Sequence, residues 1–512
     1  MRQPRTFQRS GRIALLLAAL AFQTHAQAET PQRFPANNAT GVNPDTQLVL
    51  TFASPPTIGT AGVVRIFDAS DNSLVDTLDM SIPSSPYPSG RAPPSTEAER
   101  RARAAAMKMS DYQVNTVGGV DFHFFPIIVR GNQATVHPHN NKLKYGRKYR
   151  VQMDPGILKT AQGDFAGFNN DAGWTFSTKA NPPPADAQRV IVAADGRGDF
   201  KTVQGAIDFA PVNPSKRLTI FIKAGNYEEL VYINGKANLT IRGEDRTNVI
   251  VGYPNNSAFN PPREEPSRRP AFSIQNGTDI QLSNFTINNY FTGQAEALLV
   301  RGERIVLDHM TMNGSGDALT TYGTLYMVDS KLTGHGDTIL AYAALFCLRC
   351  EIQSSGPFTW TRTPQGSHGN VFVDSTFIAL DEPQPWRVSA DGKGEQEPRK
   401  TQTLARLPRN SSRAANSKVN FPYAEMVLIN SRVDGIPPEG WGPIEPAPEF
   451  DSSNVRFFEF NTKDKQGRLV DVSQRHPVSK QLQQPRDAKI IADYSTPEFV
   501  LNGWKPVVRS SE

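Results

Sequence analysis

Residues 316–352 read GDALTTYGTLYMVDSKLTGHGDTILAYAALFCLRCEI, and this stretch decides the fold. The pattern of Gly, Asp and small or apolar residues at 316–319 returns at 336–340, which is 20 residues later. Each copy is followed by a β-rich segment, first at 324–332 and then at 344–352. A repeat of this length is typical of a unit that cannot bury its apolar face alone and therefore stacks on its neighbours.

Similar β-rich segments, separated by Asn, Gly or Asp, recur along the chain: 218–222, 239–241, 280–287, 297–312, 370–377 and 425–433. Neither heptads nor helical repeats accompany them, so we predict an all-β fold with a parallel β-helix over residues 188–508. Ahead of the first segment, four apolar residues follow Asp199 at helical spacing: Val203, Ala206, Ile207 and Ala210. We expect one amphipathic helix, capped by Asp199, to cover the open end of the stack.

The N-terminal part, residues 31–179, alternates apolar and polar residues between turn-forming residues, for example at 46–52, 63–67 and 149–153. This pattern predicts a β-sandwich. Its opening at 39–52 and its closing segment at 173–178 resemble a bacterial Ig-like module. Within it, residues 83–110 are rich in Ser, Pro, Arg and Ala, which predicts a mobile insertion. Residues 180–187 form a Pro-rich linker.

The first 28 residues predict a cleaved signal peptide, because a basic start is followed by an apolar run at 13–22 and by Ala26-Gln-Ala28. The run is too short for a membrane span, and no later stretch is long and apolar enough. The formal charge of +5 includes four arginines in this leader, and without them 51 basic residues face 50 acidic ones. A near-neutral chain without a basic and aromatic stripe does not indicate nucleic-acid binding.

Cys347 and Cys350 are the two cysteines of the chain. Their surroundings predict a strand, in which positions i and i+3 point to opposite faces and lie ~10 Å apart, too far for a disulfide. We therefore expect two buried or half-buried free thiols.

Asp317 and Asp337 occupy equivalent positions of the repeat, so a parallel β-helix places them on successive coils. Adjacent parallel strands lie ~4.8 Å apart, which brings the two carboxylates within direct electrostatic reach. The pair is expected to titrate as a unit, with one pKa raised and the other lowered. Such a pair offers a proton donor beside a nucleophile, which suits acyl transfer through a covalent intermediate.

In this interpretation Asp337 is the nucleophile and Asp317 is the general acid and then the base. Gln294, in a segment one coil upstream, suits the stabilisation of an oxyanion, and Arg406 suits the role of a cation that keeps Asp337 ionised. Spacing alone leaves a second interpretation open. Stacked Asp residues at turns also cap backbone groups or form side-chain ladders, and single polar residues also serve at surfaces.

Eight segments carry a further signal: 194–208, 221–229, 239–243, 294–298, 316–319, 336–340, 457–462 and 499–504. In this order they resemble the pectin methylesterase family (pectinesterases, carbohydrate esterase family 8), from Val190 to Pro506. The resemblance implies a right-handed parallel β-helix that removes methyl groups from galacturonate esters in pectin and releases methanol, without a metal or other cofactor. It implies the same four roles for Asp337, Asp317, Gln294 and Arg406.

The chain departs from the family motifs at three places. Gly316 stands where the family has Gln before its first Asp, and Thr338–Ala341 replaces the family's Phe-Ile-Phe-Gly. Residues 404–408 read Leu-Ala-Arg-Leu-Pro where the family has Leu-Gly-Arg-Pro-Trp, so the sugar-stacking Trp is missing. These changes remove one amide, alter the aromatic packing beside the nucleophile and delete an aromatic platform.

Three residues are therefore candidates for substrate binding: Trp360, His335 and Arg362. Trp360 suits a replacement platform, since aromatic faces bind sugar rings, or alternatively a buried position in a coil. His335 precedes Asp337 by two residues and shares its face, where it contacts substrate or is satisfied within the turn. Arg362 or Arg409 is an alternative to Arg406 as the partner of Asp337, because the alignment near these residues is loose.

Other functions remain open at this point. The Gly334-His-Gly-Asp segment resembles polygalacturonases, although the additional Asp-Asp pair of such hydrolases is missing, and a calcium-dependent pectate lyase lacks its acidic cluster. A catalytically impaired pectin-binding envelope protein is a third alternative. The favoured prediction is a secreted or periplasmic monomeric esterase that acts on pectin (homogalacturonan).

Overall fold

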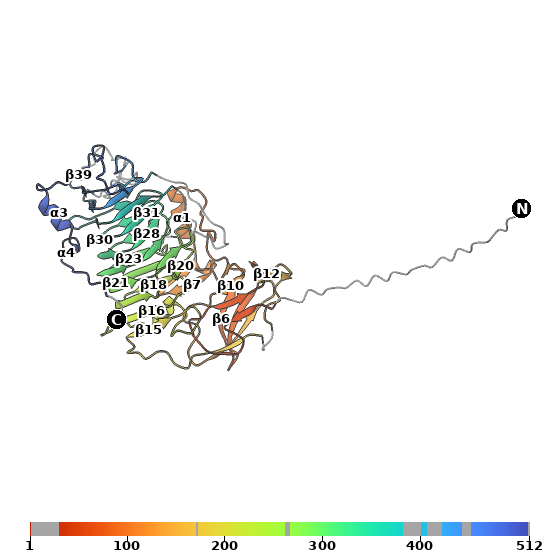
Figure 1. The fold of residues 1–512 in the computed structure, drawn as a ribbon. Helices are drawn as coiled ribbons and strands as arrows, with labels where there is room; N and C mark the ends of the chain where they lie inside the picture. Colours follow the sequence, from red (N-terminus) through yellow and green to blue (C-terminus); the bar gives the residue numbers. More distant parts are fainter. Residues whose placement is uncertain are drawn as a thin grey trace.

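The computed structural model describes Met1 and residues 30–169, 173–261, 267–381, 401–406, 422–442 and 452–509. Within this part of the chain, a β-sandwich lies beside a long stack of coils, shown from red to blue in Figure 1. Residues 2–28 of the predicted signal peptide and Arg409 lie outside the described residues. No described helix combines the length and the apolar character that crossing a membrane requires.

The sandwich is built from two main sheets whose apolar faces enclose one core. The first contains β1 (Gln32–Phe34), β3 (Leu48–Thr51), β10 (Gln133–Val136) and β9 (Ile127–Arg130). The second contains β2 (Ala39–Val42), β14 (Thr175–Thr178), β11 (Lys148–Met153), β5 (Val63–Asp68) and β6 (Leu74–Asp79). Two smaller sheets join β13 (Gly163–Asp164), β12 (Leu158–Thr160) and β4 (Thr57–Ile58), and β7 (Val114–Val117) with β8 (Val120–His123).

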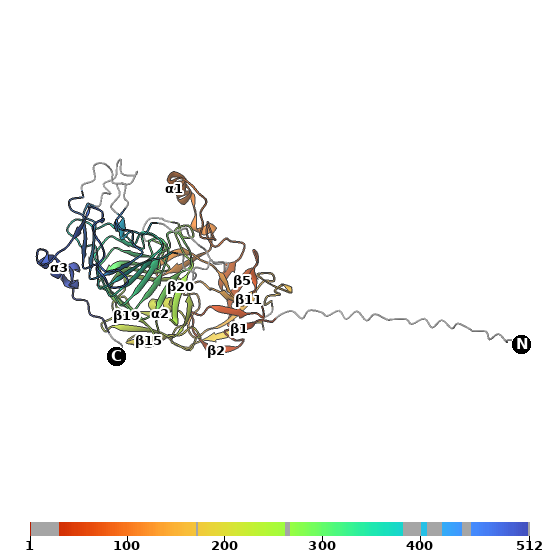
Figure 2. The same ribbon diagram turned by 45° about the horizontal axis from the view of Figure 1, so that its top comes forward.

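The Ser- and Pro-rich insertion of the sandwich contains helical structure that composition did not predict. Helix α1 (Glu97–Ala106) is followed by the 3-10 turn η1 (Met109–Asp111). Thr96 and Glu99 form a capping box at the start of α1, in which the N–H of Thr96 donates to the Glu99 carboxylate at 2.7 Å. Figure 2 shows α1 projecting away from the strands of the sandwich.

The larger part is a parallel β-helix, as predicted. One sheet contains β15 (Arg189–Val192), β16 (Leu218–Ile222), β18 (Val231–Asn234), β19 (Ala237–Gly243), β21 (Phe272–Ser283), β23 (Leu298–Glu303), β24 (Ile305–Asp308), β26 (Leu319–Thr321), β27 (Leu325–Val328), β29 (Ile339–Ala341), β30 (Leu345–Leu348), β32 (Thr359–Thr361), β33 (Asn370–Val373), β35 (Ala405–Arg406), β36 (Glu425–Ile429), β38 (Arg456–Phe460) and β39 (Ser479–Gln481). The other contains β17 (Gly225–Glu228), β20 (Val249–Tyr253), β22 (Thr286–Asn289), β25 (Thr311–Asn313), β28 (Lys331–Gly334), β31 (Glu351–Ser354), β34 (Thr376–Ala379) and β37 (Arg432–Asp434).

Helix α2 (Val203–Phe209) packs at the start of the coils, where Val203, Ala206 and Ile207 belong to the core inside the stack. The predicted helix is confirmed, but its predicted cap is wrong. Thr202 is the capping residue, because its hydroxyl accepts from the N–H of Gly205 at 3.0 Å. Asp199 instead accepts from the N–H of Ile191 at 2.8 Å. Two short C-terminal helices, α3 (Ala488–Tyr494) and α4 (Pro497–Val500), pack on the outside of the stack.

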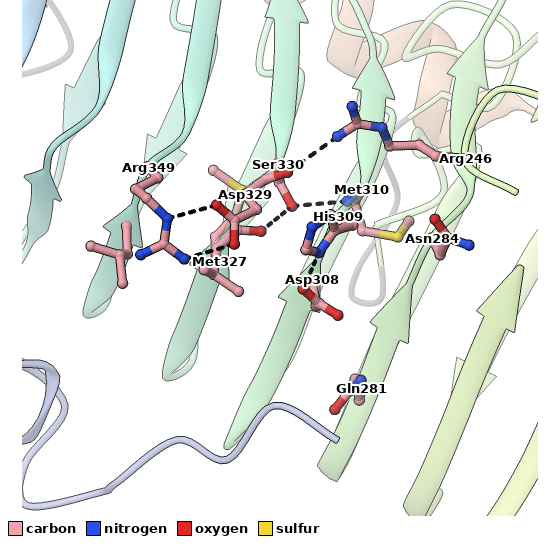
Figure 3. Close-up of polar contacts among 12 residues, drawn as sticks. Arg246, Gln281, Asn284, Asp308, His309, Met310, Met327, Asp329, Ser330 and Arg349 are labelled. Carbon is pink, nitrogen blue, oxygen red and sulfur yellow. Dashed lines mark hydrogen bonds and ion pairs between the residues drawn. The ribbon is translucent and has the colours of Figure 1, made fainter. Parts of the chain in front are cut away.

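A column of left-handed residues links the turns that end successive strands of the large sheet: His309, Asp329, Arg349, Asp374 and Asn430, with φ between 47° and 52°. Each N–H in this column donates to a carbonyl of the next coil at 2.9–3.2 Å. Figure 3 shows three of these turns, with Arg349 paired to Asp329 at 2.7 and 2.8 Å. The turns therefore fix the coil-to-coil register as firmly as the strands do.

The two cysteines are free and buried, as predicted, but their predicted geometry is wrong. Arg349 adopts the left-handed conformation between them, so the chain turns and both side chains belong to the core inside the coils. Burial raises the pKa of the Cys347 thiol well above its ordinary value. Both cysteines therefore act as small apolar core residues.

The sandwich and the first coils share an apolar interface. It contains Val117, Phe122, Phe125 and Ile128 of the sandwich with Leu230, Tyr232, Tyr253, Phe259, Ala271, Phe291 and Ala295 of the β-helix. Phe125 stacks on Phe259 with ring centroids 4.5 Å apart. Beside this cluster, Arg130 of the sandwich forms an ion pair with Glu228 of the β-helix at 2.5 Å. The two parts therefore fold against one another along a largely apolar contact.

We expect Phe259→Ala to lower the free energy of unfolding by about 3–5 kcal/mol, because Phe259 is fully buried in this interface. Val212→Ala is the matched control: Val212 is 67% exposed, and its substitution should change stability by less than about 0.5 kcal/mol. Chemical denaturation followed by tryptophan fluorescence checks both. Equal stability of the two variants would show that the interface is not tightly packed.

Candidate active site

The turns that precede β26 and β29 carry the two predicted acidic residues. Asp317 and Asp337 adopt left-handed conformations, with φ of 58° and 45°, which Asp tolerates better than most residues. The N–H of Asp317 donates to the carbonyl of Gly336 at 3.3 Å. Two residues further on, Leu319 pairs in register with Ile339. The two acidic turns therefore lie on successive coils.

Asp337 forms an ion pair with Arg406, whose Nη1 lies 2.5 Å from Asp337 Oδ2. Arg406 belongs to β35, where it pairs in register with Trp360 of β32, and its guanidinium lies 4.3 Å from the centre of the Trp360 ring. The side chains of Asp337 and Arg406 keep 17% and 29% of their surface exposed. A cation at this distance favours the ionised form of a carboxylate.

Asp317 lies in a different environment, with 8% of its side chain exposed. Gln294 Nε2 lies 3.4 Å and Arg269 Nη1 lies 3.5 Å from its Oδ2 atom. Burial raises the pKa of Asp317 to about 6; Arg269 opposes this rise and the neighbouring Asp337 adds to it. Burial thus favours the proton on Asp317, which is the raised member of the predicted pair, and the Arg406 cation lies beside Asp337.

Arg269 and Glu296 were not among the residues predicted from the sequence. Arg269 precedes β21, and its guanidinium forms an ion pair with Glu296 as well as contacting Asp317. Glu296 is fully buried, and this burial raises its pKa, whereas the ion pair with Arg269 lowers it. One signal was available for Glu296, because the family motif that 294–298 resembles has Val at this position.

One pocket of about 510 Å³ collects the predicted catalytic residues. Its lining comprises Gly293, Gln294, Gly316, Asp317, Gly336, Asp337, Pro357, Thr401, Thr403 and Arg406. The structure therefore brings all four predicted catalytic residues to one cavity. Gly316 leaves no room for the side chain that the family carries there, since an added Cβ would lie 2.8 Å from the carbonyl oxygen of Gly293.

The three predicted substrate-binding residues lie outside this lining. Guanidinium groups of Arg362 and Arg406 lie 3.7 and 4.3 Å from the centre of the Trp360 ring, so Trp360 supports these cations rather than offering a bare platform. Arg362 also donates to the Tyr342 hydroxyl. His335 is 1% exposed and its Nδ1 lies 2.5 Å from Ser355 Oγ. This burial argues against the predicted substrate contact of His335 and favours the alternative of a histidine satisfied within its turn.

A group of potential metal ligands lies elsewhere, on the turns of Figure 3. Within the described part of the chain, Asp308, His309 and Asp329 place ligand atoms within 4.8 Å of one another. These ligand atoms already have protein partners. His309 Nδ1 lies 2.5 Å from Asp308 Oδ1, and the Arg349 guanidinium donates to both carboxylate oxygens of Asp329. These contacts hold the turns together and do not reach the pocket of Asp317.

A protein-family model described as Pectinesterase matches residues 189–499, which is more than half of the chain. The chain belongs to the pectinesterase family. It is accordingly a carboxylic ester hydrolase. This membership confirms the resemblance that the ordered motifs indicated.

Two relatives illustrate the similarity of this pectinesterase to others. Pectinesterase 1 of Olea europaea is 29% identical over 297 residues, covering 54% of this chain and 71% of the relative. The pectinesterase of Ralstonia nicotianae is 27% identical over 323 residues, covering 53% and 78%. Among solved structures, pectin methylesterase from carrot aligns with a TM-score of 0.49 and 22% identity, covering 64% of this chain and 95% of that one.

We expect Asp317→Asn to flatten the pH dependence of stability. The folded pKa of Asp317, about 6, exceeds an unfolded value of about 3.9. Its proton therefore stabilises the fold below about pH 4, and this contribution is lost as the pH rises through about 6. Between pH 4 and pH 8 the unmodified protein should lose up to about 3 kcal/mol more unfolding free energy than the variant. Denaturant titrations at both pH values measure this difference, and parallel curves would contradict it.

Proposed function

We propose that this chain is a secreted pectinesterase that hydrolyses the methyl esters of galacturonate in pectin and releases methanol. Membership of the pectinesterase family and the similarity to pectinesterase 1 of Olea europaea support the choice of substrate. The observation that carries the mechanism is the contrast between two neighbouring carboxyl groups. Asp337 is paired with Arg406, whereas Asp317 is buried and has a pKa raised to about 6.

In the first step a carboxylate oxygen of Asp337 attacks the carbonyl carbon of the ester. The bond to the methoxy group breaks, and Asp317 donates its proton to the leaving oxygen, which departs as methanol. The product of this step is an acyl anhydride between Asp337 and the galacturonate carboxyl group. Arg406 keeps Asp337 ionised before the attack.

In the second step Asp317, now ionised, takes a proton from a water molecule whose oxygen attacks the anhydride carbonyl. The bond to Asp337 breaks, so its carboxylate is restored and galacturonate is released. Gln294 is exposed in the pocket one coil before Asp317, where its amide can donate to the negatively charged oxygen that forms in both steps.

We expect Asp337→Asn to lower kcat for methanol release from methylated pectin by on the order of 10⁴-fold, because the amide is not a nucleophile. Asp317→Asn should lower kcat by about 10²–10⁴-fold, since it removes the acid and base. Asp71→Asn, at an exposed turn of the sandwich, is the control. Full activity in either pocket variant would overturn the assigned mechanism.

The same assay separates the alternatives. A polygalacturonase-like hydrolase would release reducing ends rather than methanol, and a binding protein would release neither product. Reducing ends and methanol should therefore be measured in the same samples.

We expect Gln294→Ala to lower kcat by about 100-fold with little change in KM, because the amide acts on charge that forms only in the transition state. Gln466→Ala, at an exposed turn remote in sequence from the pocket, provides the matched control. A change confined to KM would assign Gln294 to substrate binding instead.

A further inference from the structure

Arg269 lies between two acidic side chains behind the wall of the pocket. Its Nη2 forms an ion pair with Glu296 Oε1, and its Nη1 lies 3.5 Å from Asp317 Oδ2. The exposed fractions of these side chains are 14% for Arg269, none for Glu296 and 8% for Asp317. Glu296 also receives a contact from Thr320 Oγ1 at 3.5 Å. Water therefore contributes little to the screening of the three charges.

The strand register explains why these groups meet. Leu298 of β23 pairs with Leu319 of β26, so Glu296 precedes its strand by as many residues as Asp317 precedes the next strand. Glu296 consequently lies one coil from Asp317, as Asp317 lies one coil from Asp337. A carboxyl group buried at this depth is costly unless it is paired or protonated, and Arg269 is the partner that the structure provides.

We propose that Glu296 is a positioning residue for the general acid: it holds the charge of Arg269 so that Asp317 keeps its proton. The inference rests on the proposed esterase mechanism and adds a third carboxyl group to it. Glu296 and Asp317 share one guanidinium. A negative charge on Glu296 offsets Arg269 and thereby favours the protonated form of Asp317, which is the form that donates to the methoxy group.

The charged groups around the pair support this direction. Arg269, Asp337, Arg362 and Arg406 all act on Asp317, and three of the four are cations that favour its ionised form. Arg269 and Asp317 act on Glu296. Burial raises the pKa of both carboxyl groups, and Arg269 lowers both. Because the contact of Arg269 with Glu296 is shorter than its 3.5 Å contact with Asp317, the guanidinium favours the ionised form of Glu296 more strongly.

The test compares pH profiles of kcat/KM for methanol release. In the unmodified enzyme the rate should fall as the pH rises through the pKa of Asp317, because the general acid is lost. Glu296→Gln keeps the shape of the side chain and removes its charge, leaving Arg269 to act on Asp317 alone. We expect this falling limb to move to lower pH by about one unit, with about tenfold lower activity above it.

Two further variants separate charge from packing. Glu296→Val combined with Arg269→Met removes both charges, and its falling limb should lie at or above that of the unmodified enzyme, never below it. Glu303→Gln removes an exposed carboxyl group from β23 itself and should leave the profile unchanged. If Glu296→Gln does not fold, Arg269→Met alone is compared with the double variant. The charge of Glu296 should place the falling limb of the single variant at higher pH than that of the double variant, and equal limbs would overturn the inference.

The inference is overturned if the falling limb of the pH profile does not move in Glu296→Gln. It is also overturned if the limb moves to lower pH by the same amount in the double variant. Methanol release by the unmodified enzyme is measured first, so its absence would refute the proposed function instead. Carboxyl ¹³C NMR of Asp-labelled protein provides a readout that needs no activity. The Asp317 resonance is assigned as the one that is missing from the spectrum of Asp317→Asn. Its titration midpoint should lie about one pH unit lower in Glu296→Gln than in the unmodified protein. An unchanged midpoint would also refute the role of Glu296.

Discussion

The hydrogen-bonded register between successive coils is the constraint on which the rest of the structure depends. The two coils that lead from β26 to β29 and from β29 to β32 add 20 residues each, and these strands pair without a shift. A slip of one residue in this pairing would shift the turn of Asp337 along the strand direction by ~3.3 Å relative to the turn of Asp317. The left-handed residues His309, Asp329 and Arg349 repeat the same spacing. The stacking of the two carboxyl groups in the pocket is therefore a consequence of repetition.

Repetition alone would give two equivalent carboxyl groups, and the pocket makes them different. Asp337 meets a guanidinium that is itself stacked on Trp360, so its cation is fixed in place. Asp317 is buried deeper and faces Arg269, which shares its charge with Glu296. The difference in protonation thus arises from the distribution of cations and solvent around a symmetric backbone.

The elements that could be predicted from the sequence are those that a short, regular repeat of residue types encodes. The spacing of Asp317 and Asp337 is visible in the chain, as is the apolar pattern of the coils. Arg269 could not be found in this way, because it precedes Asp317 by 48 positions and reaches it only through the fold. His335 shows the converse limit: alternation indicated the face of Asp337, but the tight turn at Gly336, with φ of 101°, breaks the strand geometry that this argument assumed.

The sandwich is joined to the pocket by a chain of buried amides. Asn260 pairs with the backbone of His123 in β8, and its amide donates to Asn255 at 2.9 Å. Asn255 in turn donates to the carbonyls on both sides of Arg269. The backbone N–H of Asn255 also donates to Oδ1 of Asn289 at 3.1 Å, and the side-chain amide of Asn289 donates to the carbonyl of Glu296 at 2.8 Å.

These asparagines are 0–1% exposed, so an unmade bond among them would leave a polar group unsatisfied in the interior. The chain therefore ties the backbone around Arg269 and Glu296 to a strand of the other domain. A sandwich that served only as a spacer would need none of these contacts. Its hairpin is instead part of the support for the segment that carries the charges behind Asp317, which explains why the interface between the two parts is apolar and closely packed.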